Sequence, residues 1–193
     1  MKTIILLARH GETEWNLEHR LQGHKNSPLT NTGRQQAELL RNSLGDHTIC
    51  AIYTSPLGRA VETATIVAGQ FGLDPVARDG IREINLGPWE GKTRAETEAS
   101  YPEAYQKFWC DQENFCLEGA EDYHHLEKRV VDEIEKLFRE NNGKTVLVVS
   151  HWIAIKTIVA HYLGLGLNGI DQVEDLPNGQ FVTLENSDGV VIL

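Results

Sequence analysis

Two histidines and two arginines stand at positions in the sequence from which they could act on one ligand. Arg9, His10, Arg59 and His151 each follow a short, β-branched apolar stretch, directly or after a brief turn. If these stretches are neighbouring parallel strands, their carboxyl ends lie roughly 5–10 Å apart. A guanidinium donates two hydrogen bonds to phosphate oxygens, and an imidazole can act as a nucleophile. The pattern therefore indicates a site for a tetrahedral dianion.

Each of these positions also has a purely structural interpretation. A lone histidine after a strand, such as His10, is usually a hydrogen-bonded turn residue. His151 could simply occupy the first turn of a helix that Ser150 caps, although a helix N-terminus also offers free N–H groups and positive potential to an anion. Function is favoured because three strand ends present the same chemistry.

Alternating strands and helices must position these residues. The apolar segments 3–8, 51–54 and 145–149 predict strands that are covered on both faces. Each leads into a segment with helical spacing, which is typical of an α/β protein with a parallel sheet. Near the end of the chain, residues 181–185 and 190–193 flank an Asn-Ser-Asp-Gly sequence and predict a hairpin.

Three helices are predicted between the strands. The first begins after the N-cap Thr30 and carries an apolar face to Leu44, the second covers about 57–71, and the third follows Glu121. Residues 92–120 contain many aromatic and acidic side chains and no strand signal. We expect this segment to be a helical excursion over one end of the sheet, whose aromatic residues either cover the site or pack in the core.

Composition limits the class of protein. With 193 residues, of which 40% are hydrophobic and 24% charged, the chain can form one domain with its own core. The net charge of −10 argues against a nucleic acid or an anionic membrane as partner, so an anionic substrate must meet a local cationic pocket. Three cysteines without CxxC spacing predict neither a disulfide framework nor a zinc site. A reducing compartment, the cytoplasm, is therefore expected.

Several separated blocks of the sequence resemble the histidine phosphatase (phosphoglycerate mutase-like) superfamily in their order and spacing. The blocks lie at residues 9–16, 22–23, 27–30, 55–60, 83–91 and 150–151. The resemblance implies a three-layer α/β/α fold with a mixed, mainly parallel central sheet. It also implies a single domain over residues 1–193, with the helical excursion at about 92–120 over the active site.

The resemblance implies a role for each matched position. His10 would be the nucleophile that carries phosphate as phosphohistidine, and Glu83 would be the proton donor. The side chains that would contact the phosphate or the rest of the substrate are those of Arg9, Arg59, His151, Asn16 and Gln22, together with Gly23. Because arginine and histidine supply the positive charge, neither a metal ion nor another cofactor is expected. The structural alternative for Glu83 is a surface ion pair with Arg82.

The length of the chain and the block at 83–91 resemble the phosphatase branch, in particular broad-specificity phosphatases of the PhoE type. We expect a phosphomonoesterase that acts on small phosphorylated metabolites. The alternatives are a phosphoglycerate mutase-type phosphotransferase and a phospholigand-binding pseudoenzyme. The expected partner is a small metabolite, with no nucleic acid and no membrane, and a homodimer is also considered.

Trp152 is the main departure from the family pattern. It stands directly after His151, where the family usually has glycine. Its bulky indole narrows the site whether it packs in the core at the start of a helix or contacts a substrate by stacking. Core packing is the commoner use of such a residue, and Trp152 is retained as a candidate substrate-binding residue.

Overall fold

One mixed sheet holds the predicted strand ends together. The structure is a computed structural model that describes residues 2–187 and 190–192. In these residues the strand order is β3-β2-β4-β1-β5-β6, with bounds β1 Thr3–Arg9, β2 Ile49–Thr54, β3 Val76–Ala77, β4 Thr145–Ser150, β5 Phe181–Ser187 and β6 Val190–Ile192. Strands β3, β2, β4 and β1 run parallel, whereas β5 and β6 pair antiparallel. The predicted mixed, mainly parallel sheet is confirmed.

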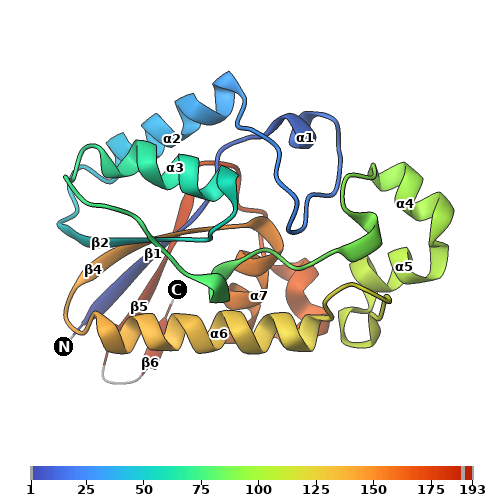
Figure 1. The fold of residues 1–193 in the computed structure, drawn as a ribbon. Coiled ribbons are helices and arrows are strands. Elements are labelled where there is room, and N and C mark those ends of the chain that lie inside the picture. Colours follow the sequence, from blue (N-terminus) through green and yellow to red (C-terminus); the bar gives the residue numbers. More distant parts are fainter. Residues whose placement is uncertain (1, 188–189, 193) are drawn as a thin grey trace.

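Helices cover both faces of this sheet. Their bounds are α1 Glu14–Leu17, α2 Asn31–Ser43, α3 Gly58–Ala68, α4 Arg94–Ser100, α5 Pro102–Cys110, α6 Tyr123–Glu140 and α7 Trp152–Tyr162. Short 3₁₀ turns cover Asp79–Ile81, Gly87–Trp89, Gln112–Asn114 and Leu167–Gln172. Helices α2 and α3 lie on one face and α6 and α7 on the other, while α4 and α5 lie beyond one end of the sheet (Figure 1). No helix in the described residues is long and apolar enough to cross a membrane.

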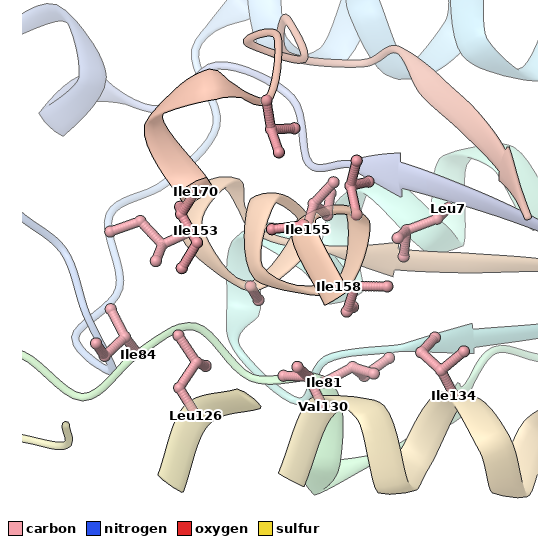
Figure 2. Packing of buried hydrophobic residues seen from close by; sticks show 14 of the residues in the cluster. Leu7, Ile81, Ile84, Leu126, Val130, Ile134, Ile153, Ile155, Ile158 and Ile170 are labelled. Atoms are coloured by element: carbon pink, nitrogen blue, oxygen red, sulfur yellow. The ribbon is translucent and has the colours of Figure 1, made fainter. Parts of the chain in front are cut away.

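The central strand β1 shows why its sequence is continuously apolar. Leu6 and Ala8 pack into the cluster beneath α2 and α3, whereas Ile5 and Leu7 pack into the cluster that α6 and α7 cover. Successive side chains of a strand point to opposite faces, so a strand covered on both sides must be apolar at every position. Figure 2 shows Leu7 among isoleucines of α7 and the apolar face of α6, which includes Val130.

The predicted helices form, with one boundary corrected. Thr30 caps α2 by accepting from the Gly33 N–H, and Asp122 caps α6 in the same way. The second helix was predicted to reach Phe71, but α3 ends at Ala68. Residues 70 and 71 donate to carbonyls three residues earlier, and Gly72, at φ +62°, then donates to the Ala68 carbonyl. A left-handed glycine ends the helix by this geometry.

The prediction that Ser150 caps the last helix is wrong. Ser150 is still in β4, paired in register with Arg9, and its hydroxyl donates to the Ile81 carbonyl. His151 is the N-cap residue of α7, and its side chain makes no capping bond. The antiparallel pairing of β5 and β6 is as predicted for a hairpin, and residues 188–189, where its turn was expected, lie outside the described residues.

Candidate active site

The carboxyl ends of β2, β4 and β1 meet at one edge of the sheet and open into a cavity of about 110 Å³. Eight of the nine predicted site residues line this cavity: Arg9, His10, Asn16, Gln22, Gly23, Arg59, Glu83 and Trp152. The ninth, His151, lies directly behind it, with its ring centroid 5.2 Å from that of His10. Side chains from distant parts of the chain therefore converge as the strand-end pattern predicted.

His10 is held in one protonation state. Its Nδ1 lies 2.7 Å from the Gly11 carbonyl oxygen, and since a carbonyl only accepts, Nδ1 carries the proton. Its Nε2 accepts a hydrogen bond of 3.3 Å from Arg59 Nε. Burial, followed by the charges of Arg59 and Arg9, holds the pKa of His10 well below its usual value. The imidazole is therefore neutral, with an unprotonated Nε2.

The backbone around His10 is fixed from three elements. The His10 N–H donates to the Ser150 carbonyl, and Asn178 Nδ2 donates to the His10 carbonyl over 2.9 Å. Gly11 packs so closely on α2 that a Cβ there would lie 2.3 Å from the Gly33 carbonyl oxygen. Sequence reasoning did not identify Asn178, because its contact with His10 joins residues 168 positions apart.

Arg59 is a buried guanidinium with donors to spare. Its Nη1 donates to the Lys25 carbonyl and its Nη2 to the Gly23 carbonyl, while Nε donates to His10. Burial is the main cause that lowers its pKa to about 10, so it stays a cation at neutral pH. A guanidinium has five N–H groups. Two of them have no acceptor in the described part of the protein, and they can serve an anion in the cavity.

Arg9 supplies a second guanidinium at the end of β1. Its Nη1 donates to the Leu176 carbonyl over 2.8 Å, and its guanidinium carbon lies 5.8 Å from the centroid of the Trp152 ring. Burial is also the main cause that lowers the pKa of Arg9. Its buried Nε has no acceptor among the described residues. Arg9 is thus anchored at one nitrogen and retains donors for a ligand.

His151 is fully buried between the strand end and the cavity. Its Nε2 lies 2.7 Å from Ser55 Oγ, and its Nδ1 has no partner within the described residues. Burial, followed by the charges of Arg59 and His10, holds the pKa of His151 well below its usual value. A buried polar atom without a partner is costly and calls for an explanation. With its ring next to that of His10, His151 is a candidate contact for a ligand in the cavity.

Glu83 lies at the N-terminus of α7. Its Oε1 accepts from the N–H groups of Ile84 and Ala154, and its Oε2 accepts from that of Ile153. The carboxylate thereby occupies the capping position that Ser150 was predicted to fill. The surface ion pair of Glu83 with Arg82 is wrong, because Glu83 is buried and Arg82 pairs with Asp79.

The α1 segment orients Asn16 and Gln22. Asn16 Oδ1 accepts from the backbone and the hydroxyl of Thr13, which turns the amide N–H groups of Asn16 toward other acceptors. Gln22 Nε2 donates to the same Thr13 hydroxyl. Gly23 has φ +51°, and a Cβ there would lie 2.3 Å from Glu90 Oε1. Glycine is therefore needed at this position, where the backbone carbonyl accepts a hydrogen bond from Arg59 Nη2.

Trp152 both lines the cavity and packs against the edge of the main hydrophobic core. Its indole is half-buried, and Nε1 donates to Asp175 Oδ1 over 3.0 Å.

The cavity wall also contains residues that the sequence did not predict. These are Trp15, His19, Arg20, Leu21, Leu86, Arg94, Trp109 and Ile153. Of the aromatic residues in the excursion, Phe108 and Phe115 are buried around Trp89, whereas Trp109 reaches the cavity.

Comparison with known proteins defines the class. Residues 5–192 match the model of the histidine phosphatase superfamily (branch 1), and the chain belongs to this superfamily of enzymes. The chain is 32% identical over 164 residues to phosphoserine phosphatase 1 of Hydrogenobacter thermophilus, and the alignment covers 85% of this chain and 78% of that protein. It is 33% identical over 162 residues to the probable phosphoglycerate mutase GpmB of an Enterobacter species, and this alignment covers 83% of this chain and 75% of that protein.

A solved structure shows the same fold at similar identity. Bacillus stearothermophilus YhfR superposes with a TM-score of 0.96 and 34% sequence identity, over 99% of this chain and 95% of that chain. Both a named phosphatase and a named mutase are thus among the relatives. The relationship establishes the superfamily.

Proposed function

We propose that this protein is a phosphomonoesterase that hydrolyses small phosphorylated metabolites through a phosphohistidine on His10. The observation that carries the proposal is the neutral imidazole of His10, whose unprotonated Nε2 lies beside two guanidinium groups. An uncharged ring nitrogen can attack phosphorus, while fixed positive charge stabilises the transferring phosphoryl group.

In the first step, the phosphate would bind to the free N–H groups of Arg9, Arg59 and Asn16, with His151 Nδ1 as a further contact. His10 Nε2 attacks phosphorus in line, the N–P bond forms and the bond to the ester oxygen breaks. Protonated Glu83 gives its proton to that oxygen, so the leaving group departs as an alcohol. The Nδ1–H of His10 stays hydrogen-bonded to the Gly11 carbonyl, which stabilises the cationic ring.

In the second step, a water molecule replaces the alcohol. Glu83, now a carboxylate at the cavity wall, takes a proton from this water as the oxygen attacks phosphorus. The N–P bond breaks, its electron pair returns to Nε2, and inorganic phosphate leaves. Because Arg9 and Arg59 supply the positive charge throughout, the proposed reaction uses neither a metal ion nor another cofactor.

The test is hydrolysis of p-nitrophenyl phosphate by the wild-type protein and by His10→Ala, with trapping of the label from a ³²P-phosphomonoester under alkaline quench. We expect an acid-labile, alkali-stable label on the wild-type protein, and neither label nor turnover with His10→Ala. The matched control is His124→Ala, which changes an exposed histidine. Wild-type hydrolysis by His10→Ala would refute the proposal.

A mutase is the second candidate, supported by the relative named as a probable phosphoglycerate mutase. A mutase would transfer the phosphoryl group from His10 to a second hydroxyl faster than to water, and it would depend on a bisphosphate primer. Isomerisation of 3-phosphoglycerate that outpaces phosphate release would favour it. A pseudoenzyme predicts phosphate binding with no phosphohistidine, and Trp152 supports it poorly because the indole leaves His10 on the cavity wall.

We further propose a cytoplasmic location and a soluble small-molecule substrate, acted on by a single domain. The three cysteines are free and exposed, which suits a reducing compartment. The net charge of −10 disfavours polyanionic partners. Fractionation of cells followed by detection of the protein tests the location.

A further inference from the structure

Two carbonyls of one loop orient Arg59. Those of Gly23 and Lys25 accept from the two terminal nitrogens of its guanidinium, over 2.8 and 2.7 Å. His24 lies between these two residues in the sequence, and its side chain contacts the backbone of Glu83. One short loop therefore contacts both a guanidinium of the phosphate site and the segment that carries the proposed proton donor.

His24 holds the segment 83–86 at both ends. Its Nε2 lies 2.8 Å from the Glu83 carbonyl oxygen, and since a carbonyl only accepts, Nε2 carries the proton and donates. The backbone N–H of His24 donates to Glu90 Oε1 over 2.7 Å, and the same carboxylate oxygen accepts from the N–H of Leu86. The side chain of His24 thus contacts the start of the segment directly, and its backbone contacts the end through Glu90.

The main chain and the side chain of Glu83 are fixed by different elements. Its carboxylate accepts from N–H groups at the start of α7, whereas its carbonyl accepts from Arg129 of α6 and from His24. A carbonyl oxygen has two lone pairs, and these two donors match them. Arg129 ties Glu83 to α6, and His24 ties it to the loop that orients Arg59.

His24 lies outside the active-site cavity. The described residues that line this cavity include Glu83 and Leu86 but not His24. His24 lines a separate groove of about 590 Å³, to which the same segment contributes Arg82 and Asn85. The segment therefore separates the cavity from the groove, and a substrate in the cavity meets Glu83 rather than His24.

Proton transfer to the ester oxygen depends on the distance between Glu83 and the bound phosphate. A general acid acts within hydrogen-bond reach, about 2.6–3.2 Å, and a displacement of about 1 Å can cost on the order of 100-fold in rate. Arg59 binds the phosphate in the proposed reaction, and three hydrogen bonds join Arg59 to Glu83 through the loop of His24. This series of contacts sets the distance that proton transfer needs.

We propose that His24 is a positioning residue, which holds Glu83 at the distance from the phosphate that proton transfer requires. It acts through the Glu83 carbonyl and does not touch the substrate. This inference rests on the proposed phosphomonoesterase activity and adds to it a residue outside the cavity.

The test compares two substrates whose leaving groups differ in their need for a proton. We would measure kcat/KM, which reports the steps up to formation of the phosphohistidine, for glycerol 3-phosphate and for p-nitrophenyl phosphate. For His24→Leu we expect a loss of at least about tenfold with the first and of less than about twofold with the second. The ratio of the two values does not depend on the fraction of folded protein.

Two further substitutions of His24 test the hydrogen bond itself. His24→Gln places an amide Nε2 near the position of the imidazole Nε2, so it should restore most of the lost kcat/KM. His24→Asn is too short to reach the Glu83 carbonyl and should behave like His24→Leu, which it replaces if the leucine variant does not fold. Equal values for the glutamine and asparagine variants would overturn the inference.

A double-mutant comparison shows whether His24 acts through Glu83. Glu83→Gln has no proton to give, so adding His24→Leu to it should lower kcat/KM for glycerol 3-phosphate no further. A loss as large as in the wild-type background would overturn the positioning of Glu83 by His24.

The matched control is His124→Leu. It removes a bond of the same kind, from His124 Nε2 to the Glu113 carbonyl, at an exposed position outside the cavity wall. It should leave kcat/KM for both substrates unchanged. Equal losses for both substrates in His24→Leu would overturn this inference alone, provided that the wild-type protein still forms a phosphohistidine. Absence of that label, with no hydrolysis of either substrate by the wild-type protein, would overturn the proposed function and this inference with it.

Discussion

Arg59 donates a hydrogen bond to His10, with Nε and Nε2 separated by 3.3 Å. An arginine can only donate, so the bond exists only while His10 Nε2 lacks a proton. The same guanidinium is tied to the carbonyls of Gly23 and Lys25, which keeps it from turning away. Arg59 thus both opposes protonation of the nucleophile and retains two N–H groups for the phosphate that the nucleophile attacks.

The first prediction concerns stability against pH. His10 and His151 are neutral in the folded protein at pH values where an unfolded histidine, with a pKa of about 6.5, takes up a proton. Below pH 6.5 the unfolded state binds more protons, so the free energy of unfolding falls as the pH falls. The slope approaches about 1.4 kcal/mol per pH unit for each histidine as the pH falls below 6.5, and it ends at the native pKa values. Urea unfolding between pH 7.5 and 5.5 measures it.

Carboxylates also change the free energy of unfolding as the pH falls, and variants separate the contribution of the histidines from theirs. His10→Asn and His151→Asn should each lower the slope of the free energy of unfolding against pH by the contribution of one proton, whereas His124→Asn, at an exposed position, should have the wild-type slope. Equal slopes in all four proteins would show that neither buried histidine resists protonation.

The second prediction concerns Glu83. Glu83→Gln removes both the proton for the leaving group and the base for water, so hydrolysis of alkyl phosphates should fall at least about 100-fold. p-Nitrophenolate leaves without a proton, so this substrate should still phosphorylate His10. We expect a burst of p-nitrophenol and accumulation of phosphohistidine in rapid-quench measurements. Glu62→Gln, on the surface, is the control. Equal losses for alkyl and aryl substrates with no burst would argue against the acid–base role.

The sequence predicted the strand ends well because their signals are local. An apolar run followed by arginine or histidine identifies both the strand and the residue that leaves it, as at Arg9 and His10. The prediction that Ser150 is the N-cap of the last helix failed because serine directly before a helical segment is a common N-cap residue. In the structure, the Ser150 hydroxyl instead donates to the Ile81 carbonyl, and Glu83 caps the helix. Both contacts join residues far apart in the sequence, so local sequence does not indicate them.

Trp152 was a candidate substrate-binding residue, but the meeting of side chains around it at the rim of the cavity could not be predicted, for the same reason. Arg94, Trp109 and Trp152 come from three helices, and nothing in the local sequence indicates that they meet. Trp109 and its neighbour Phe108 have the same aromatic character, yet Phe108 is buried in the core and Trp109 lines the cavity. Which side chains of the short helix α5 point to the core and which to the cavity depends on the packing of all of residues 92–120.

The third prediction concerns inhibitors. Because Arg9 and Arg59 supply the charge at the phosphate site, EDTA should leave p-nitrophenyl phosphate hydrolysis unchanged. Orthovanadate can become five-coordinate when the His10 Nε2 binds it, which gives the trigonal-bipyramidal geometry of phosphoryl transfer, and it should inhibit competitively against the substrate. Steady-state kinetics at several vanadate concentrations without EDTA measure the inhibition. Separate assays with and without EDTA, in the absence of vanadate because EDTA binds vanadate, measure the metal dependence. Loss of activity in EDTA that a divalent metal restores would contradict the proposed chemistry.

The fourth prediction concerns Arg129 of α6, which holds the loop that carries Glu83. Its guanidinium donates to the carbonyls of Gly80, Arg82 and Glu83 and forms a pair with the Glu121 carboxylate. Lysine cannot reproduce this fork. Arg129→Lys should remove a donor from the part-buried carbonyls of Gly80 and Arg82, at a cost of about 1–3 kcal/mol for each carbonyl left unpaired, which thermal unfolding detects. The Glu83 carbonyl keeps its bond to His24 Nε2.

Displacement of the loop should also move Glu83 relative to the ester oxygen, and a shift of about 1 Å can cost 100-fold in rate. For Arg129→Lys we therefore expect kcat for glycerol 3-phosphate, which needs a proton donor, to fall at least about tenfold more than kcat for p-nitrophenyl phosphate. Arg139→Lys, an exposed position on the same helix, should change neither. If Arg129 had a purely structural role, kcat for both substrates would fall equally, in proportion to the fraction of folded protein. This outcome would show that Arg129 does not position Glu83.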